Sequence, residues 1–431
     1  MKQMMMKVRQ VFSTDLVKVS FLNGISTVIR MLAGVVSTKV VASVVGPVGI
    51  ALLGQLSNFT TIILSLANGG ITTGITKYIS EHSEKEEKTS LYIGTAFRIT
   101  FIFSLITGLV MIIGAGYFSN LILKGDEYRS VFYIFGITII FYALNALLLA
   151  ILNGFKEYKL FVRVNIISSL TSLLFSVVMA LSFGLMGALI SVVTFQSVVF
   201  LITLVLVSKT PWFSWSMFLG RIDRKSANNL IQYSIMALAT AIIVPLSQLL
   251  VRGYIAGKLS VTDAGIWESV NRISGMYLMV VVTSFSVYYL PRLAELKNDS
   301  MIRKEVMSVY QLMIPFLIVA SIGIYILRDL IIAILFTSEF NRMGDLLPFQ
   351  LIGDILKMSG WVLGYLMVAK AMTRTYIFME ILNYALFVVL SYILISFYGV
   401  KGATIAYAIG HLIYLVGMFI IFRKMMFGNG R

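Results

Sequence analysis

The sequence predicts an all-α membrane protein that crosses the bilayer many times. The chain has 431 residues, of which 58% are hydrophobic and 13% are charged, whereas a soluble domain carries about 25% charged residues. Apolar runs recur from end to end of the chain, and runs of roughly 20 residues are long enough to cross a ~30 Å hydrocarbon core as helices. A transmembrane β-barrel would instead show ~10-residue segments of alternating polarity.

Twelve transmembrane spans follow from these apolar runs, joined by short connections. The two longest connections, near 208–228 and 328–345, leave no room for a folded domain outside the membrane. The predicted spans are 17–43, 50–77, 91–118, 130–152, 160–183, 186–207, 229–252, 264–290, 305–327, 346–369, 377–397 and 402–422.

An internal repeat predicts that the twelve spans form two six-helix lobes. The segment "FGLMGA" at 183–188 matches "YGVKGA" at 398–403, half a chain away, and both lie between the last two spans of a six-span set. A second pair, "PVGIALL" at 47–53 and "DAGIWES" at 263–269, has nearly the same offset. An even number of spans per lobe makes the lobes parallel repeats, related by an axis along the membrane normal. The alternative is that Gly-x-x-Gly turns recur by chance.

The predicted lobes are 1–208 and 229–431, joined by a cytoplasmic linker at 209–228. The basic residues predict how these lobes are oriented in the membrane. With the N-terminus inside, the cytoplasmic loops and tails carry about three times as many Lys and Arg residues as the opposite loops, which is the bias of the positive-inside rule. Both termini are therefore expected in the cytoplasm. The basic N-terminus lacks the apolar core and cleavage site of a signal peptide.

Several classes of function are excluded by composition and missing motifs. The chain has no cysteine, so it has no disulfide and no thiolate chemistry. The net charge of +16 reflects basic cytoplasmic loops rather than nucleic-acid binding. No Walker A, G-x-G-x-x-G or H-E-x-x-H motif is present. We therefore expect no cofactor, no metal, no catalytic residue and no enzyme activity.

Charged residues inside the predicted spans need a partner or water, because each costs ~2.5–3.5 kcal/mol at the bilayer centre even on a lenient scale. Glu268 and Arg272 are four residues apart, and Asp354 and Lys357 are three apart. Both spacings place the two charges on one helix face, where they can pair. Structural ion pairs are therefore one explanation of these four residues.

Two further bases, Arg30 and Arg98, have no acidic residue on their own spans. Even if both acids are paired, the deep bases outnumber them. An aqueous, positively charged cavity that suits an anion is the simplest account of this surplus.

Small and polar residues recur at three- and four-residue steps, which places them on one helix face. Helix packing explains such stripes as well as a cavity does. Because repeat transporters place their sites between the two halves, we expect a cavity there, lined by spans one, two, seven and eight with the tenth nearby. The stripe of the second span is Asn58, Thr61, Ser65, Asn68, Thr72 and Thr76.

The chain resembles the bacterial Wzx-type flippases of the multidrug/oligosaccharidyl-lipid/polysaccharide exporter superfamily. The resemblance is carried by "GIWESVNRIS", "SFSVYYLPRLAEL", "LLPFQLIGDILKM" and "GYLMVAKA" in the second half, and by "GPVGIALLGQLSNF" and "GGITTGITKYISE" in the first. It covers nearly the whole chain. Within the family it is strongest to the branch that handles the precursor of enterobacterial common antigen.

The resemblance implies a V-shaped, MATE-like pair of six-helix lobes in the bacterial inner membrane. The cargo would be an undecaprenyl-pyrophosphate-linked oligosaccharide, such as an O-antigen unit, moved from the cytoplasmic to the periplasmic leaflet by alternating access. A coupling cation or proton is expected, and a polysaccharide polymerase and a chain-length regulator are possible partners.

The candidate site residues take their roles from this cargo. Arg30, Arg98 and Arg272 would donate to phosphate, because a guanidinium group matches its geometry. Glu268 and Asp354 would bind a counter-cation, contact sugar hydroxyls or hold the arginines. The candidate substrate-binding residues are Arg30, Arg98, Arg272, Glu268, Asn271, Asn58, Asn68, Asp354, Lys357 and Trp267.

Two other functions compete with this one. A multidrug or organic-cation antiporter of the same fold would be expected to carry a buried acid in its first half, where none is predicted. A membrane polysaccharide polymerase or ligase would be expected to have a long periplasmic loop with catalytic groups, and the longest outward connection, 328–345, is short.

Overall fold

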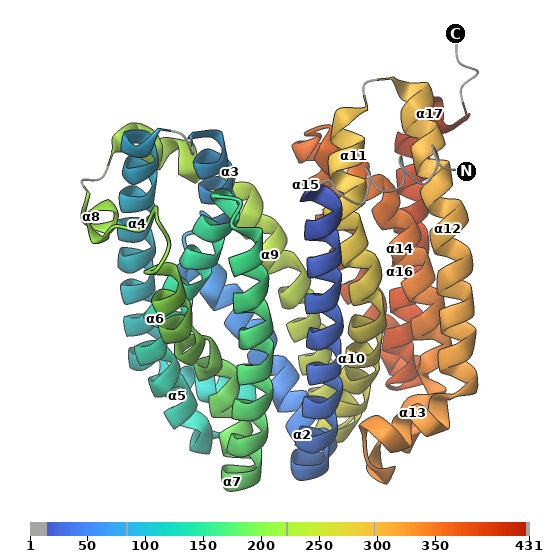
Figure 1. Ribbon diagram of the computed structural model, residues 1–431. Coiled ribbons are helices and arrows are strands. Elements are labelled where there is room, and N and C mark those ends of the chain that lie inside the picture. The colour runs from blue at the N-terminus through green and yellow to red at the C-terminus, as the bar shows by residue number, and fades with distance from the viewer. Residues whose placement is uncertain (1–14, 83–84, 221–222, 297, 428–431) are drawn as a thin grey trace, which may run out of the picture. The chain divides into compact units, whose positions relative to one another are not determined.

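The computed structural model describes residues 15–82, 85–220, 223–296 and 298–427, which fold almost entirely into helices without a strand among them (Figure 1). The predicted all-α fold is confirmed. Contacts divide the chain into a first unit, Met1–Ser37 and Phe59–Ile242, and a second unit, Thr38–Asn58 and Ile243–Arg431. The lobes 1–208 and 229–431 stay a prediction. The two contact units differ from these lobes, because residues 38–58 pack with the second unit.

The first unit is organised around α6, which contacts α3, α4 and α7. Its core includes the fully buried Ile75, Ile93 and Ile151. Figure 1 shows α8 beside α4, in agreement with the contacts between these two helices. The elements are α2 (Asp15–Ala67, shared with the second unit), α3 (Thr72–His82), α4 (Glu86–Ile113), α5 (Ala115–Phe118), η1 (Ser119–Leu123), η2 (Asp126–Tyr128), α6 (Arg129–Gly154), α7 (Tyr158–Val207) and α8 (Trp215–Leu219).

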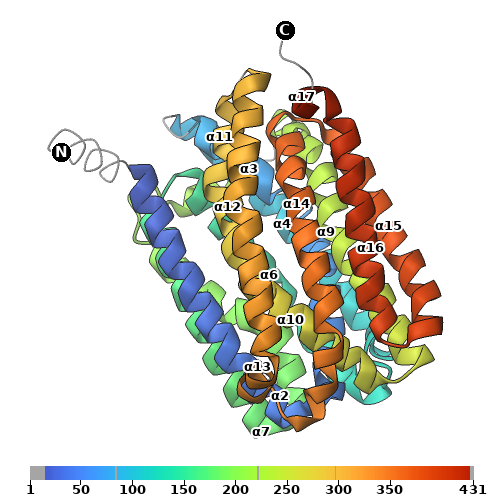
Figure 2. The ribbon, with the colours of Figure 1, turned by 90° about the vertical axis from the view of Figure 1, so that its right-hand side faces the viewer.

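The second unit is organised around α14, which contacts α10, α12, α15 and α16. Figure 2 shows α12, α14 and α16 side by side. Met358, Val362 and Leu363 of α14 are fully buried in its core. The elements are α9 (Arg224–Lys258, shared with the first unit), α10 (Val261–Ser284), η3 (Phe285–Tyr289), α11 (Leu290–Glu295), α12 (Asp299–Ile326), α13 (Arg328–Leu335), η4 (Ser338–Asp345), α14 (Leu347–Ala369), α15 (Thr373–Tyr398), α16 (Lys401–Ile421) and α17 (Arg423–Phe427).

In the described part of the chain, nine helices are long and apolar enough to cross a membrane. Two of them, in α2 and α7, run for 44 and 50 residues, far more than the ~20 that one crossing needs. Both contain a glycine with non-helical backbone angles. The protein is a multi-pass membrane protein, and the count of twelve spans stays a prediction.

The bend in α2 lies at Gly46 and Pro47, between the first two predicted spans. Gly46 has a φ of 62°, a left-handed conformation that a side chain disfavours. Pro47 lacks the backbone N–H that would continue the helical hydrogen bonds. These two neighbours explain why the helix changes direction at this point.

The predicted second span, 50–77, is wrong in its last ten residues. The helix ends at Ala67, and α3 begins only at Thr72. Gly69 and Gly70 between them have φ values of 59° and 66°. A side chain at Gly70 would also lie 2.7 Å from Leu238. The predicted polar stripe is therefore not one continuous helix face, because the chain turns between Asn68 and Thr72.

The two turns of the predicted repeat have the same geometry. Gly184 and Gly399, 215 positions apart, have φ values of 57° and 60° with ψ values of −138° and −148°. A side chain at Gly187 would lie 1.9 Å from the carbonyl oxygen of residue 179, and one at Gly402 would lie 2.3 Å from that of residue 394. Each contact reaches eight residues back along the chain. The two turns thus share their local geometry, and the repeat of the two halves stays a prediction.

Candidate functional site

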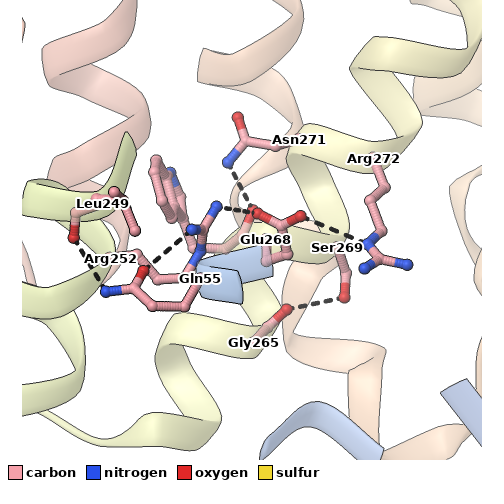
Figure 3. Close-up of polar contacts among 9 residues, drawn as sticks. Gln55, Leu249, Arg252, Gly265, Glu268, Ser269, Asn271 and Arg272 are labelled. Atoms are coloured by element: carbon pink, nitrogen blue, oxygen red, sulfur yellow. Dashed lines mark hydrogen bonds and ion pairs between the residues drawn. The ribbon is translucent and has the colours of Figure 1, made fainter. Parts of the chain in front are cut away.

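The strongest candidate site lies in the second unit, where one carboxylate contacts two arginines. Glu268 of α10 lies between Arg252 of α9 and Arg272 of α10 (Figure 3). The Nη2 of Arg252 donates a short hydrogen bond to Oε2 of Glu268. The Nε of Arg272 donates to Oε1 at 3.4 Å. The predicted pairing of Glu268 with Arg272 is present, but Glu268 makes its shorter contact with Arg252.

Arg252 is held from several sides. Its Nη1 donates to Oε1 of Gln55 at 3.1 Å, and the Nε2 of Gln55 donates to the carbonyl oxygen of Leu249 at 3.3 Å (Figure 3). Asn58, with its amide oxygen turned toward the guanidinium, accepts from Nη1 at 3.1 Å and Nη2 at 3.3 Å. The guanidinium also lies 5.5 Å from the ring centre of Trp267, within the range of a cation–π contact.

Two glycines let α10 approach the α2 segment of the same unit. A side chain at Gly54 would lie 2.6 Å from the carboxyl carbon of Glu268, and one at Gly265 would lie 1.8 Å from the carbonyl oxygen of Pro47. Neither position has room for a Cβ atom. The Glu268 carboxylate therefore rests directly on the backbone of α2.

The two arginines differ in access to solvent. The Arg252 side chain is 3% exposed, that of Glu268 is 12% exposed and that of Arg272 is 25% exposed. One acid and two bases leave the trio with an excess positive charge. Arg272 is therefore the more accessible of the two cations.

Sequence reasoning missed the role of Arg252. The seventh span was predicted to end at residue 252, which placed Arg252 at the outer boundary. The helix α9 continues to Lys258, and Arg252 is buried within it. Three polar residues in the predicted spans could have indicated this role, because their oxygens need a buried hydrogen-bond donor. They are Gln55, Asn58 and Glu268.

Asn271 and Trp267 serve the local packing of α10. The Nδ2 of Asn271 donates to the carbonyl oxygen of Trp267 at 3.0 Å. Trp267 is 1% exposed and contacts Arg252 through its ring. Their predicted contacts with substrate stay predictions.

Asp354 lies in a second polar cluster, where neutral groups replace the predicted ion pair. Its Oδ2 accepts from the hydroxyls of Ser274 at 2.6 Å and Tyr277 at 2.9 Å, and its Oδ1 accepts from Tyr407 at 2.9 Å. No ion pair joins Asp354 and Lys357 in the described part of the chain. The three hydroxyls, which come from α10 and α16, take the place of the ammonium group.

Lys357 lies over aromatic rings instead. Its Nζ is 4.9 Å from the ring centre of Trp361 and 5.8 Å from that of Tyr407. A buried acid on α15, Glu380, accepts from the hydroxyl of Tyr414 at 3.1 Å. Sequence reasoning missed Glu380, because a single acid in an apolar run has no partner at helical spacing.

The remaining candidates, Arg30, Arg98 and Asn68, lie in the first unit. Arg30 is exposed on α2, and Arg98 is half-buried on α4. Asn68 is 6% exposed, and its Oδ1 accepts no hydrogen bond from the residues that the structure describes. The described residues of this unit include no buried Asp or Glu, as the sequence predicted.

The chemistry of the Glu268 trio suits an anion rather than a metal. No group of three or more His, Asp or Glu residues in the described ranges could hold a metal ion. A guanidinium group offers several N–H donors in a planar fork that matches phosphate or carboxylate oxygens. Arg272 is only partly neutralised, because its partner Glu268 also pairs with Arg252. An anion near Arg272 would therefore be attracted to it.

Comparisons with known proteins identify the family of the chain. The family described as "Polysaccharide biosynthesis protein" matches residues 53–345. The lipid III flippase of Escherichia coli (strain K12) is 30% identical over 413 residues, which covers 95% of this chain and 99% of that protein. The lipid III flippase of Shigella flexneri has the same identity and coverage. These relatives are named as flippases and not as enzymes, as the sequence predicted.

Solved structures share the fold. A multidrug resistance MATE family transporter of the MOP superfamily, in an inward-facing conformation, aligns with a TM-score of 0.79 at 12% identity, covering 93% of this chain and 98% of that one. A MOP superfamily transporter from Pyrococcus furiosus aligns with a TM-score of 0.72 at 13% identity, covering 95% of each chain. The chain therefore has the fold of the MOP superfamily and belongs to the polysaccharide biosynthesis protein family.

Proposed function

We propose that this protein is a flippase for a lipid-linked, negatively charged oligosaccharide. The observation that carries the proposal is the Glu268 trio, in which two arginines share one acid and one arginine is accessible. The relatives named lipid III flippase support a glycan attached to a lipid as cargo. An undecaprenyl pyrophosphate linkage would supply the anion.

The chemistry of the trio fits a diphosphate in a membrane. A charge in the bilayer interior is costly unless it is paired, so the excess cation favours an anionic ligand. Arg272 can turn from Glu268 to a phosphate oxygen, while Arg252 keeps the acid neutralised. A bound ligand therefore gains a charge-assisted hydrogen bond without leaving the buried acid alone.

The remaining features of the transport cycle are part of the proposal. The protein would lie in the bacterial inner membrane with both termini in the cytoplasm, and would move its cargo to the periplasmic leaflet by alternating access. A cavity between the lobes, a coupling cation or proton, and a polysaccharide polymerase partner stay predictions from the sequence.

Complementation of bacterial strains that lack defined flippases tests the proposal. Expression of this chain should restore a surface glycan in one such strain, and the glycan that returns identifies the cargo. If no strain regains a glycan while the protein is present in the membrane, the proposal is wrong. Resistance to organic cations in place of glycan export would favour the antiporter function.

Arg272→Gln tests the role of the site. Because Glu268 keeps its ion pair with Arg252, loss of Arg272 should cost less stability than loss of Arg252, yet it should reduce glycan export about tenfold, as one lost charge-assisted contact predicts. The matched control is Arg292→Gln, which removes a 42% exposed arginine from ion pairs with Glu295 and Glu305. Equal export by both variants at equal protein levels would argue against a ligand at Arg272.

A further inference from the structure

The first unit contains an apolar pocket beside α8, outside the candidate site. Its volume is about 300 Å³, at the small end of the range for ligand pockets, so it suits part of a chain rather than a whole large ligand. Three helices of the unit supply most of its wall, and α8 supplies the rest. The lining residues are Phe97, Leu144, Leu147, Leu148, Phe200, Leu204, Trp215 and Phe218. We call this the α8 pocket.

The wall that α8 contributes is fixed to α4. Gly94 lets α8 approach, because a side chain there would lie 2.9 Å from the carbonyl oxygen of Met217. The backbone N–H of Asp223 donates to the hydroxyl of Thr95 at 3.1 Å. The rings of Phe97 and Phe218 meet edge to face at 5.7 Å. The segment predicted as a linker therefore forms a permanent side of the pocket.

Only hydrocarbon suits the interior of the α8 pocket. A buried water needs two to four polar partners, and the lining side chains are Leu, Phe and one Trp. Trp215 is 61% exposed, which is typical of a ring at a membrane–water interface. The pocket thus lies where a lipid chain leaves the interface and enters the unit.

We propose that the α8 pocket holds part of the isoprenoid chain of the lipid-linked glycan. The proposal rests on the proposed function and adds a place for the tail of the cargo. Four aromatic rings and four leucine side chains line the pocket, and this apolar wall suits the branched hydrocarbon of an isoprenoid chain. The segment that carries α8 also holds the exposed Lys209, Arg224 and Lys225, whose charges attract a diphosphate head.

The location explains how tail and head can be recognised separately. The α8 pocket lies near the ends of α6 and α7 that lead to the side predicted to be cytoplasmic, where the cargo is made available. A tail held there keeps the glycan attached to the first unit while its head moves. Transport should therefore depend on the length of the isoprenoid chain, and the α8 pocket should be the part of the protein that causes this dependence.

Filling the pocket tests the proposal. Leu204→Trp and Leu144→Trp place an indole in the pocket at two half-buried positions, and Leu201→Trp is the matched control on the exposed face of α7. Purified variants in vesicles would transport an undecaprenyl-pyrophosphate-linked sugar and an analogue with a short prenyl chain. We expect each filling variant to raise the KM for the long-chain substrate about tenfold, equivalent to losing one or two buried methylene groups, and to leave the short-chain KM unchanged.

A labelling experiment keeps the test decisive if a filling variant folds poorly. A photoreactive undecaprenyl phosphate should label the lining residues of the wild-type protein, and excess undecaprenyl phosphate should suppress the labelling while phosphatidylglycerol does not. Equal suppression by phosphatidylglycerol would show an ordinary phospholipid site and overturn the proposal. Equal effects of filling on both chain lengths would also overturn it. Failure of the wild-type protein to transport either substrate would instead refute the proposed function.

Discussion

Two carboxylates in the second unit, one partly exposed and one fully buried, are stabilised in opposite ways. Glu268 contacts two arginines, one buried and one partly exposed. Asp354 is fully buried and accepts three hydrogen bonds from neutral hydroxyls. The two acids lie on neighbouring helices, α10 and α14. The difference between their partners therefore does not arise because they lie in distant parts of the molecule.

The difference separates a site that can exchange partners from one that cannot. The acid of the Glu268 trio has more cations than it needs, so one of them is available to a ligand. The hydroxyls around Asp354 have no better acceptor to turn to, and their bonds join α10, α14 and α16. We therefore expect substitutions at the first acid to change transport and substitutions at the second to change stability.

The largest effect is expected from exchanging the charges of Glu268 and Arg272. Glu268→Arg combined with Arg272→Glu would restore an i,i+4 pair, but it would place a second arginine against the buried Arg252. Like charges without an intervening acid are strongly unfavourable in a low-dielectric interior. Glycan export and the amount of folded protein in the membrane should both fall to background. Rescue relative to the single variants would mean that Arg252 is not a true partner of Glu268.

Removal of Arg252 alone should be the next most damaging change. Arg252→Met leaves Glu268 with a single 3.4 Å contact and removes the donor to Gln55. Breaking a buried pair costs about 3–5 kcal/mol, which thermal unfolding of the detergent-purified protein would measure. Unchanged stability would show that Arg272 alone suffices for the acid.

Asp354→Asn should have a smaller effect, because the amide keeps one oxygen as an acceptor. Reorienting the hydroxyls of Ser274 and Tyr277 around the new NH₂ group should cost about 1–2 kcal/mol. Glycan export, corrected for protein level, should remain above half of the wild-type value. Abolished export by a stable variant would give Asp354 a role in transport and remove the contrast with Glu268.

The smallest effect concerns a surface carboxylate that resembles Asp354 in its donors. Asp223 caps α9, and its Oδ2 accepts from the backbone N–H of Ser226 at 2.7 Å and from the Ser226 hydroxyl at 2.6 Å. These bonds hold the pKa of Asp223 below its ordinary value of 3.8. The cap therefore stabilises the fold above that value, and its contribution is lost as the pH falls through the lower folded-state pKa.

Asp223→Asn tests this cap. The unfolding temperature of the wild-type protein should fall between neutral pH and pH values below 3.8. The unfolding temperature of the variant should fall less over the same range. At neutral pH the two proteins should differ little, because Asn also caps helices well. An identical acid profile for both proteins would mean that the cap does not contribute to stability.

The helical fold and one of the two expected ion pairs could be predicted from the sequence. Apolar runs and the spacing of Glu268 and Arg272 are local signals, and a helix converts them directly into structure. The break before α3 was also visible, because Asn68 is followed by two glycines, a combination typical of turns. The apolar residues on either side of these glycines favour a continuous span, which hides this signal.

The rest depended on contacts between helices that are distant in sequence. Arg252 and Glu268 meet across two helices, and Gln55 joins them from nearly 200 residues away. The hydroxyls that displace Lys357 from Asp354 come from residues 274, 277 and 407. Spacing along one helix cannot reveal which of several polar groups a neighbouring helix will offer.

The missing side chain at Gly54 decides how fast the Glu268 site can respond. The carboxylate lies against the bare backbone at that position, so it has no freedom to swing toward α2. An exchange of partners must then take place by rotation of the Arg272 side chain, a local change that needs no movement of a helix. Capture of an anion at this point would be complete long before any rearrangement of helices, which takes microseconds or longer.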